Sequence, residues 1–175
     1  MGHRYLEITS TPSVRAARLR WDGTDRYEEA SQGADTHDRF GAAEAAFVSA
    51  RDGFYLGSVN ESGWPYIQFR GGPRGFLRVL DETTLGFADF RGNRQYLTVG
   101  NVQRDDRVAL FLMDYAHRRR LKVLGRLSFV DDPRFVERVA VPGYAAKVER
   151  AARIELVAFD WNCPQHIPVR LDGPG

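Results

Sequence analysis

Beyond Gly53 the chain settles into short runs in which hydrophobic and polar residues alternate or apolar residues dominate. Runs of this kind, bounded by turn residues, are typical of β-strands. The turn signals Glu61-Ser62-Gly63 and Asp81-Glu82-Thr83 each separate two such runs, which predicts two hairpins. The run RVALFLM is nearly all apolar and predicts a buried central strand, with which the alternating run after it should pair. The expected strands are residues 54–60, 64–69, 76–80, 84–90, 107–113, 121–130 and 154–161.

Helical signals gather at the start of the chain and between the later strands. An alanine-rich stretch with apolar residues at the spacing of one helix face predicts an amphipathic helix over 41–50. Pro12 precedes a short arginine-rich helix, Thr24 can cap a second one, and Asp131-Asp132-Pro133 opens a helix with acidic residues at its positive end. The expected helices are residues 13–20, 24–31, 41–50, 96–102, 131–139 and 144–152, with irregular segments at 32–39 and 162–175.

Short strands joined mostly by turns favour an antiparallel barrel over a doubly wound sheet. We therefore predict an α+β fold, a six-stranded antiparallel barrel with flanking helices. The sequence contains no internal repeat, low-complexity tract or linker that marks a domain boundary. Residues 1–175 are expected to form a single domain, in which a helical N-terminal extension (1–50) packs on the barrel (51–170).

Composition and charge narrow the classes of function. The 25 basic and 23 acidic residues leave a net charge of +2, too small for a general nucleic-acid or membrane-surface binder. No window approaches 18 apolar residues, and the first twenty residues lack the apolar centre of a signal peptide. A single cysteine, Cys163, excludes an intrachain disulfide framework and favours a reducing compartment. We expect a soluble, cytoplasmic protein with no nucleic-acid or membrane partner.

Two arginine- and glycine-containing loops, each following a strand, are the first candidate chemistry. Gly71 and the glycine after it let a ligand approach the backbone, and Arg70 and Arg74 flank them with guanidinium groups that suit phosphate. The second loop holds Asn93 and Gln95, with arginines beside them, just before a helical segment whose N–H groups can bind phosphate. A wide turn with solvated arginines and a capping loop explain the same patterns. The two loops together favour an anion site more than either does alone.

Two further segments carry candidate binding residues. Arg118, Arg120 and Lys122 share one face of a strand and could line an anionic cofactor site, although a charged outer face of the barrel explains them equally well. Trp161 and His166 follow the last strand and could close over a planar ligand by stacking and hydrogen bonding.

Cysteine and metal chemistry find little support in the sequence. Cys163 with the nearby His166 invites a nucleophile hypothesis, but no third orienting group is evident, and a free cysteine often serves as a small apolar residue. The four histidines show no metal-ligand spacing, and no HExxH, CxxC, GxGxxG, Walker A or GxSxG motif occurs. We therefore predict no metal site and name no catalytic residue.

Five segments, in this order, carry a family resemblance: SGWPYIQFRGGPRGFLRVLDE (62–82), LGFADFRGNRQYLTVGN (85–101), DDRVALFLMDY (105–115), RRLKVLGR (119–126) and FDWNCPQH (159–166). Together they resemble the pyridoxamine 5′-phosphate oxidase-like, FMN-binding split-barrel superfamily. Within it, the chain is most similar to the flavin-nucleotide-binding protein branch. The resemblance covers residues 47–170. It implies a six-stranded split barrel that forms a homodimer, with FMN bound in clefts between the subunits.

The resemblance also implies roles for individual residues. Gln68, Phe69, Arg70 and Gly71 would lie along the flavin and its phosphate, and Ala88 and Asp89 by the ring. Asn93, Arg94 and Gln95 would hold the phosphate. Arg120 or Lys122 would lie near the ring, and Trp161 and His166 would approach from the C-terminal segment, across the dimer.

Two departures from the pyridoxamine-phosphate oxidases bear on the substrate. Those enzymes have a lysine after the phosphate-loop arginine, where this chain has Gln95, and a C-terminal arginine-rich motif, where this chain has WNCPQH. The resemblance therefore implies an FMN-dependent oxidoreductase acting on a small molecule other than a vitamin B6 phosphate. A flavin-binding module that stores or senses the cofactor, or a relative that binds deazaflavin or haem, is the alternative.

Overall fold

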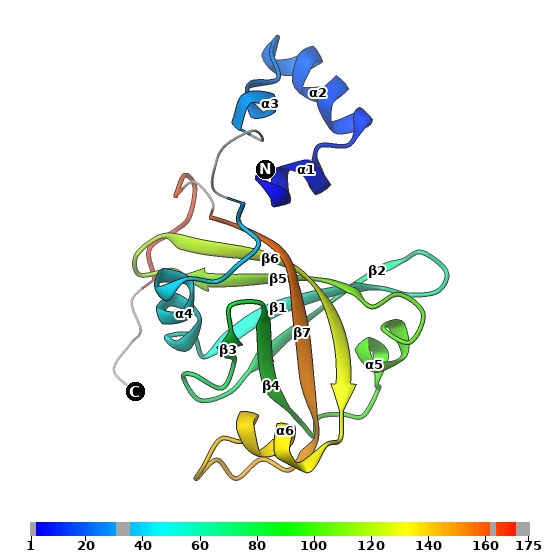
Figure 1. The fold of residues 1–175 in the computed structure, drawn as a ribbon, viewed down its shortest axis with the longest axis vertical. Helices are drawn as coiled ribbons and strands as arrows, with labels where there is room; N and C mark the ends of the chain where they lie inside the picture. Colours follow the sequence, from blue (N-terminus) through cyan, green and yellow to red (C-terminus); the bar gives the residue numbers. More distant parts are fainter. Residues whose placement is uncertain (1–2, 31–35, 162–163, 171–175) are drawn as a thin grey trace.

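The computed structural model describes residues 3–30, 36–161 and 164–170. It is an α+β fold in which one strongly bent sheet surrounds the core and helices lie at its ends and sides (Figure 1). The helices are α1 (Arg4–Thr9), α2 (Pro12–Asp22), α3 (Arg26–Ala30), α4 (Ala42–Ser49), α5 (Leu97–Asn101) and α6 (Pro133–Val139). The strands are β1 (Gly53–Val59), β2 (Pro65–Gly71), β3 (Arg78–Asp81), β4 (Thr84–Phe90), β5 (Arg107–Asp114), β6 (Arg119–Val130) and β7 (Val148–Trp161).

The seven strands form one antiparallel sheet in the order β2-β1-β5-β6-β7-β4-β3. Both predicted hairpins form, with Val59 opposite Pro65 in the first and Asp81 opposite Thr84 in the second. The prediction of six strands was wrong by one, because every run marked in the sequence forms a strand. The four-residue β3 is stable as a separate strand because it pairs with β4 at the edge of the sheet.

The predicted helix over 144–152 was wrong over its whole length, because residues 144–147 form no helix. Residues from Val148 onward belong to β7, which runs to Trp161 without a break and pairs with β4 and β6. Alanine favours helix when a segment stands alone, which explains the prediction. Here Ala151 and Ala152 are fully buried between two neighbouring strands. Pairing on both sides outweighs the local preference of these residues.

The core fills the space inside the bend of the sheet. Its largest fully buried side chains include Phe54, Phe76 and Phe87, whose rings contact one another at 5.4–6.5 Å between centroids. β5 lies between β1 and β6, as predicted, but only one of its faces is buried: Leu110 and Leu112 are in the core, whereas Ala109 is exposed and Phe111 is half-buried.

Two helices are attached to the barrel by polar contacts. The Glu44 carboxylate at the start of α4 accepts from the Gly41 N–H at 2.9 Å and from Trp161 Nε1 at 2.8 Å. On α5, Asn101 donates to the Ser58 hydroxyl at 2.9 Å and Thr98 to the Gln68 side chain at 3.1 Å. Because Ser58 lies on β1 and Gln68 on β2, these two hydrogen bonds hold the short α5 against the edge of the sheet.

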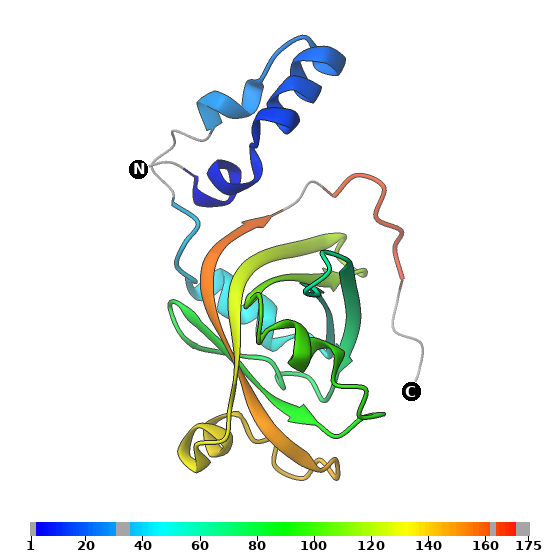
Figure 2. The same cartoon turned by 90° about the vertical axis from the view of Figure 1, so that its right-hand side faces the viewer.

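The N-terminal helices extend from one end of the barrel (Figure 2). The sequence did not predict α1, which lies against the C-terminal end of β7, while α2 and α3 follow farther from the sheet. No residue of α1 or α2 is buried, and Trp21 on α2 is 80% exposed. In the part of the chain described, no helix combines the length and the apolar character needed to span a bilayer.

Candidate functional site

A pocket opens where β2, β4, the first residues of β7, α5 and the loop between β4 and α5 meet. Six of the predicted ligand-binding residues line it: Gln68, Arg70, Asp89, Asn93, Arg94 and Gln95. The two candidate loops therefore come together, although Arg94 lies 24 positions after Arg70 in the sequence. The other lining residues are Tyr66, Phe90, Gly92, Tyr96, Leu97, Thr98, Val99 and Glu149.

Arg70 is the buried cation of this pocket. Its side chain is 14% exposed and forms an ion pair with Asp89, which is itself 8% exposed. Arg150 approaches the other Asp89 oxygen, with Nε at 3.1 Å from Oδ2. Asp89 therefore bridges two arginines. The Arg70 Nε atom is buried and has no hydrogen-bond partner among the described residues.

A bulge in β7 brings a second carboxylate to the pocket. Asp89 pairs with Arg150, but Phe90 pairs with Val148, so Glu149 is the extra residue. A bulge re-aims the side chains beside it. Glu149 accepts from Arg91 Nε at 2.8 Å and from Arg150 Nη2 at 3.0 Å. The hydrogen bonds and charges of these two guanidinium groups hold the pKa of Glu149 below its usual value, and Arg91 has the larger effect. Glu149 therefore stays ionised at neutral pH.

The loop between β4 and α5 has an unusual backbone. Arg94 and Tyr96 adopt left-handed conformations, with φ of 59° and 55°, which cost non-glycine residues about 1–3 kcal/mol each. The Asn93 side chain supports the turn by accepting from the Gln95 N–H at 3.2 Å. Such strain persists only where surrounding contacts hold it. The loop is therefore positioned before any ligand arrives.

Three other predicted residues lie on the outer face of the sheet and not in the pocket. Phe69 is on the opposite face of β2 from Arg70 and is 59% exposed. Arg120 and Lys122 are on β6, in register with Met113 and Phe111 of β5. Lys122 Nζ lies 2.7 Å from Asp160 Oδ2, and the buried Arg120 Nε has no hydrogen-bond partner among the described residues.

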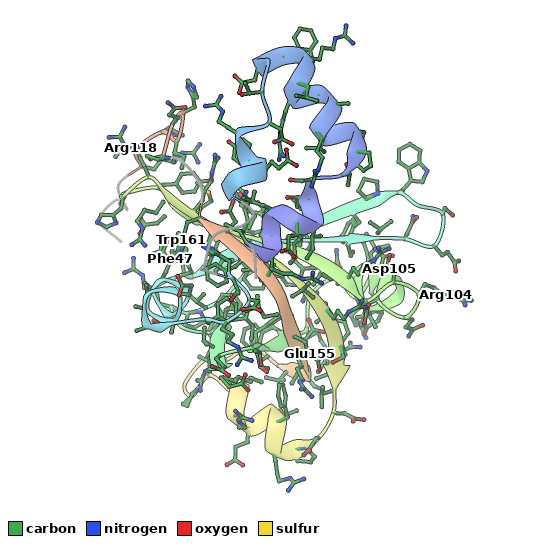
Figure 3. All side chains as sticks on the ribbon, turned by 45° about the horizontal axis from the view of Figure 1, so that its top comes forward. Phe47, Arg104, Asp105, Arg118, Glu155 and Trp161 are labelled. Carbon is green, nitrogen blue, oxygen red and sulfur yellow. The ribbon has the colours of Figure 1, made fainter. Side chains whose placement is uncertain are left out.

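The remaining predicted residues are separate from both groups. Gly71 ends β2 against the Phe69 ring, and Ala88 is a buried residue of β4. Trp161 packs edge-on against Phe47 of α4 with ring centroids 4.8 Å apart, and the two side chains lie together in Figure 3. His166 is exposed in the C-terminal segment, and Cys163 lies outside the described residues.

The outer face itself is notably apolar. Tyr55, Ile67 and Phe69 are large and exposed there, and Tyr55 pairs with both Phe69 and Phe111 across the strands. Ile67 is 67% exposed. Exposed apolar patches of this kind mark contact surfaces in soluble proteins. Phe69, Arg120 and Lys122 therefore belong to a different surface of one chain from the Arg70 pocket.

The residues of the pocket fit an anionic group. Arg70 and Arg94 line it, and Arg70 keeps a buried, unused donor. Sequence reasoning missed Tyr66 and Glu149. Tyr66 could have been found, because it lies two residues before Gln68 and so shares its face of β2. Glu149 could not, because its position depends on the bulge in a segment that the sequence predicted as helix.

The family described as "Pyridoxamine 5'-phosphate oxidase" matches residues 40–161. No curated protein sequence matches the chain at a significant level.

Solved structures share the fold at low sequence identity. HupZ from Group A Streptococcus is 11% identical with a TM-score of 0.55, over 69% of this chain and 92% of its own. An FMN-binding protein from Syntrophomonas wolfei is 11% identical with a TM-score of 0.54, over 67% of this chain and 82% of its own. A FAD-binding protein from Mesorhizobium loti is 13% identical with a TM-score of 0.50, over 70% of this chain and 94% of its own.

Proposed function

Because this chain belongs to the pyridoxamine 5′-phosphate oxidase family, we propose that it is a flavoprotein that binds FMN and acts as an oxidoreductase on a small molecule. The observation that carries the proposal is the Arg70 pocket, where a buried guanidinium with an unused donor meets the preset Asn93–Gln95 loop. Two neighbours of the same fold are described as FMN-binding and FAD-binding proteins, which supports a flavin as the ligand class.

Each side chain then has a specific task. Arg70 and Arg94 neutralise the phosphate, with Arg70 Nε as a donor that needs no prior bond to break. Asn93 keeps the loop in its strained shape, so Gln95 is presented in a fixed orientation. A bound flavin would supply the redox chemistry, while the protein supplies position and electrostatics.

We propose that the active form is a homodimer with the cofactor between the subunits. The exposed apolar face around Tyr55, Ile67 and Phe69 supports this, because a second chain would remove it from water. Arg120 and Lys122 lie at the margin of that face and would contribute positive charge near the flavin ring. Trp161 and His166 are proposed to approach from the partner subunit.

The departures at Gln95 and in the C-terminal segment direct the proposal away from vitamin B6 phosphates. The pocket and the loop are proposed to bind the cofactor phosphate, and the substrate is proposed to be a small molecule that contacts the flavin ring. The ring of Tyr96, 44% exposed beside the pocket, offers a surface on which such a planar molecule can stack.

The test is the absorption spectrum of the purified protein, with mass spectrometry of whatever heat releases. A flavin spectrum with released FMN supports the proposal, and oxidation of NAD(P)H with an added acceptor then supports turnover. Bound FMN without any turnover would favour a storage or sensing module. Binding of deazaflavin or haem in place of FMN would overturn the cofactor assignment.

A further inference from the structure

A cluster of two histidines and one carboxylate joins the N-terminal extension to the barrel, away from the Arg70 pocket. His3 lies at the start of α1, His37 in the segment that leads to α4, and Asp160 near the end of β7. Each offers one ligand atom, and the three atoms all lie within 4.8 Å of one another. All three residues are half-buried. Imidazole nitrogen with carboxylate oxygen is a donor set that suits first-row divalent metal ions.

Backbone contacts hold the three segments in place. The Arg4 N–H, one residue after His3, donates to the Thr36 carbonyl at 2.9 Å. The Phe159 N–H, one residue before Asp160, donates to the His37 carbonyl at 2.8 Å. His37 therefore lies between α1 and β7. Its own carbonyl is hydrogen-bonded to β7, and the carbonyl of the preceding residue, Thr36, is hydrogen-bonded to α1. Its φ of 51° is left-handed, a conformation that a histidine keeps only where its surroundings fix it.

The side chains are arranged so that one carboxylate oxygen faces the histidines. Lys122 Nζ holds Asp160 Oδ2 at 2.7 Å, and Oδ1 lies 3.5 Å from His3 Nε2. A hydrogen-bonded second oxygen is how proteins orient a ligating carboxylate. The two imidazole rings are stacked, with centroids 3.8 Å apart and planes 13° from parallel. One of the two rings would have to turn before a nitrogen of each could bind a common ion.

We propose that His3, His37 and Asp160 bind a divalent transition-metal ion of the Zn²⁺ type, which fastens α1 to the end of β7. Two neutral nitrogen ligands and one carboxylate leave at least one position for water in a tetrahedral site. The ion would replace weak contacts between α1 and the barrel by bonds that cross from one to the other. It would also fix Tyr5, whose ring lies 4.5 Å from Lys122 Nζ at the edge of the outer face.

The experiment uses the full chain, stripped of metal with a chelator and titrated with Co²⁺ by visible absorption and with Zn²⁺ by calorimetry. We expect one saturable site per chain and slower amide hydrogen exchange in α1 when Zn²⁺ is bound. His3→Gln and Asp160→Asn should each weaken binding by about tenfold or more, since each removes one ligand. Asp160→Asn keeps the shape of the side chain, and circular dichroism checks that both variants fold.

His117→Ala is the matched control, because His117 also contacts a carboxylate, with Nδ1 at 3.0 Å from Asp114 Oδ1, but lies outside the cluster. It should bind Zn²⁺ as tightly as the unmodified chain. Absence of saturable binding, or equal affinity in His117→Ala and the folded ligand variants, would overturn the metal site. Tight binding with unchanged hydrogen exchange in α1 would overturn its fastening role.

Discussion

Replacing Arg70 with alanine should weaken FMN binding while leaving riboflavin binding nearly unchanged. Riboflavin lacks the phosphate, so the comparison isolates the contact that Arg70 is proposed to make. A hydrogen bond to a charged group contributes about 1.5–3 kcal/mol. Since about 1.4 kcal/mol corresponds to a tenfold change in affinity, the Kd for FMN should rise about 10- to 150-fold.

The same substitution should lower stability only moderately. Stripping a buried charge of its one partner costs about 3–5 kcal/mol. Asp89 keeps Arg150, with Nε at 3.1 Å, when Arg70 is removed. We therefore expect a loss of about 1–3 kcal/mol in the free energy of unfolding, which leaves a folded protein whose binding can be measured.

The assay is quenching of flavin fluorescence on titration with FMN and, separately, with riboflavin, alongside a denaturant melt. Arg70→Lys keeps the charge but loses the planar fork and should give an intermediate Kd for FMN. Arg104→Ala, which removes a 73% exposed arginine outside the pocket, is the matched control. Equal losses for FMN and riboflavin in the folded Arg70→Ala variant would refute the assignment of Arg70 to the phosphate.

Three further predictions test the fold and the assembly. Gly125→Ala should cost about 1–3 kcal/mol in a denaturant melt, because the added Cβ would lie 2.8 Å from the Glu155 carbonyl oxygen; an unchanged midpoint would contradict this packing. Ile67→Glu should convert the proposed dimer to a folded monomer in light scattering, and an unchanged dimer mass would place the interface elsewhere. Burial alone would raise the pKa of Asp114, but hydrogen bonds from His117 and the charge of Arg51 hold it below its usual value. The contribution of ionised Asp114 to the free energy of unfolding is therefore complete above about pH 4 and is lost as the pH falls further. In Asp114→Asn, the free energy of unfolding should fall less steeply as the pH is lowered below about 4.

The strands could be predicted from the sequence because the features that form them are local. Alternation puts one side of each strand in the core, and turn residues such as Gly63 end one strand before the next begins. The hairpins and the buried strand at 107–113 were accordingly predicted within a few residues. The segment from Val148 to Ala152 was not, because its alanines gain their burial only from β4 and β6.

The candidate site, too, could be predicted from the sequence only in part. Arginine and glycine loops after strands indicated an anion site, and six of the predicted residues do line one pocket. The sequence could not show that Asp89 holds Arg70 and Arg150 at once, or that a bulge brings Glu149 beside them. Those facts depend on which strand lies beside which.

The sequence by itself thus determined the chemistry available to this protein: two phosphate-suited loops, an antiparallel fold and little net charge. Only the tertiary structure decided how that chemistry is distributed. It brought Arg70 and Arg94 into one pocket, turned Phe69 and Lys122 to the outer face, and joined His3, His37 and Asp160 across more than 150 residues of chain. The physical reason is that local preferences act over a few residues, whereas strand order and register set contacts between residues that are far apart in the sequence.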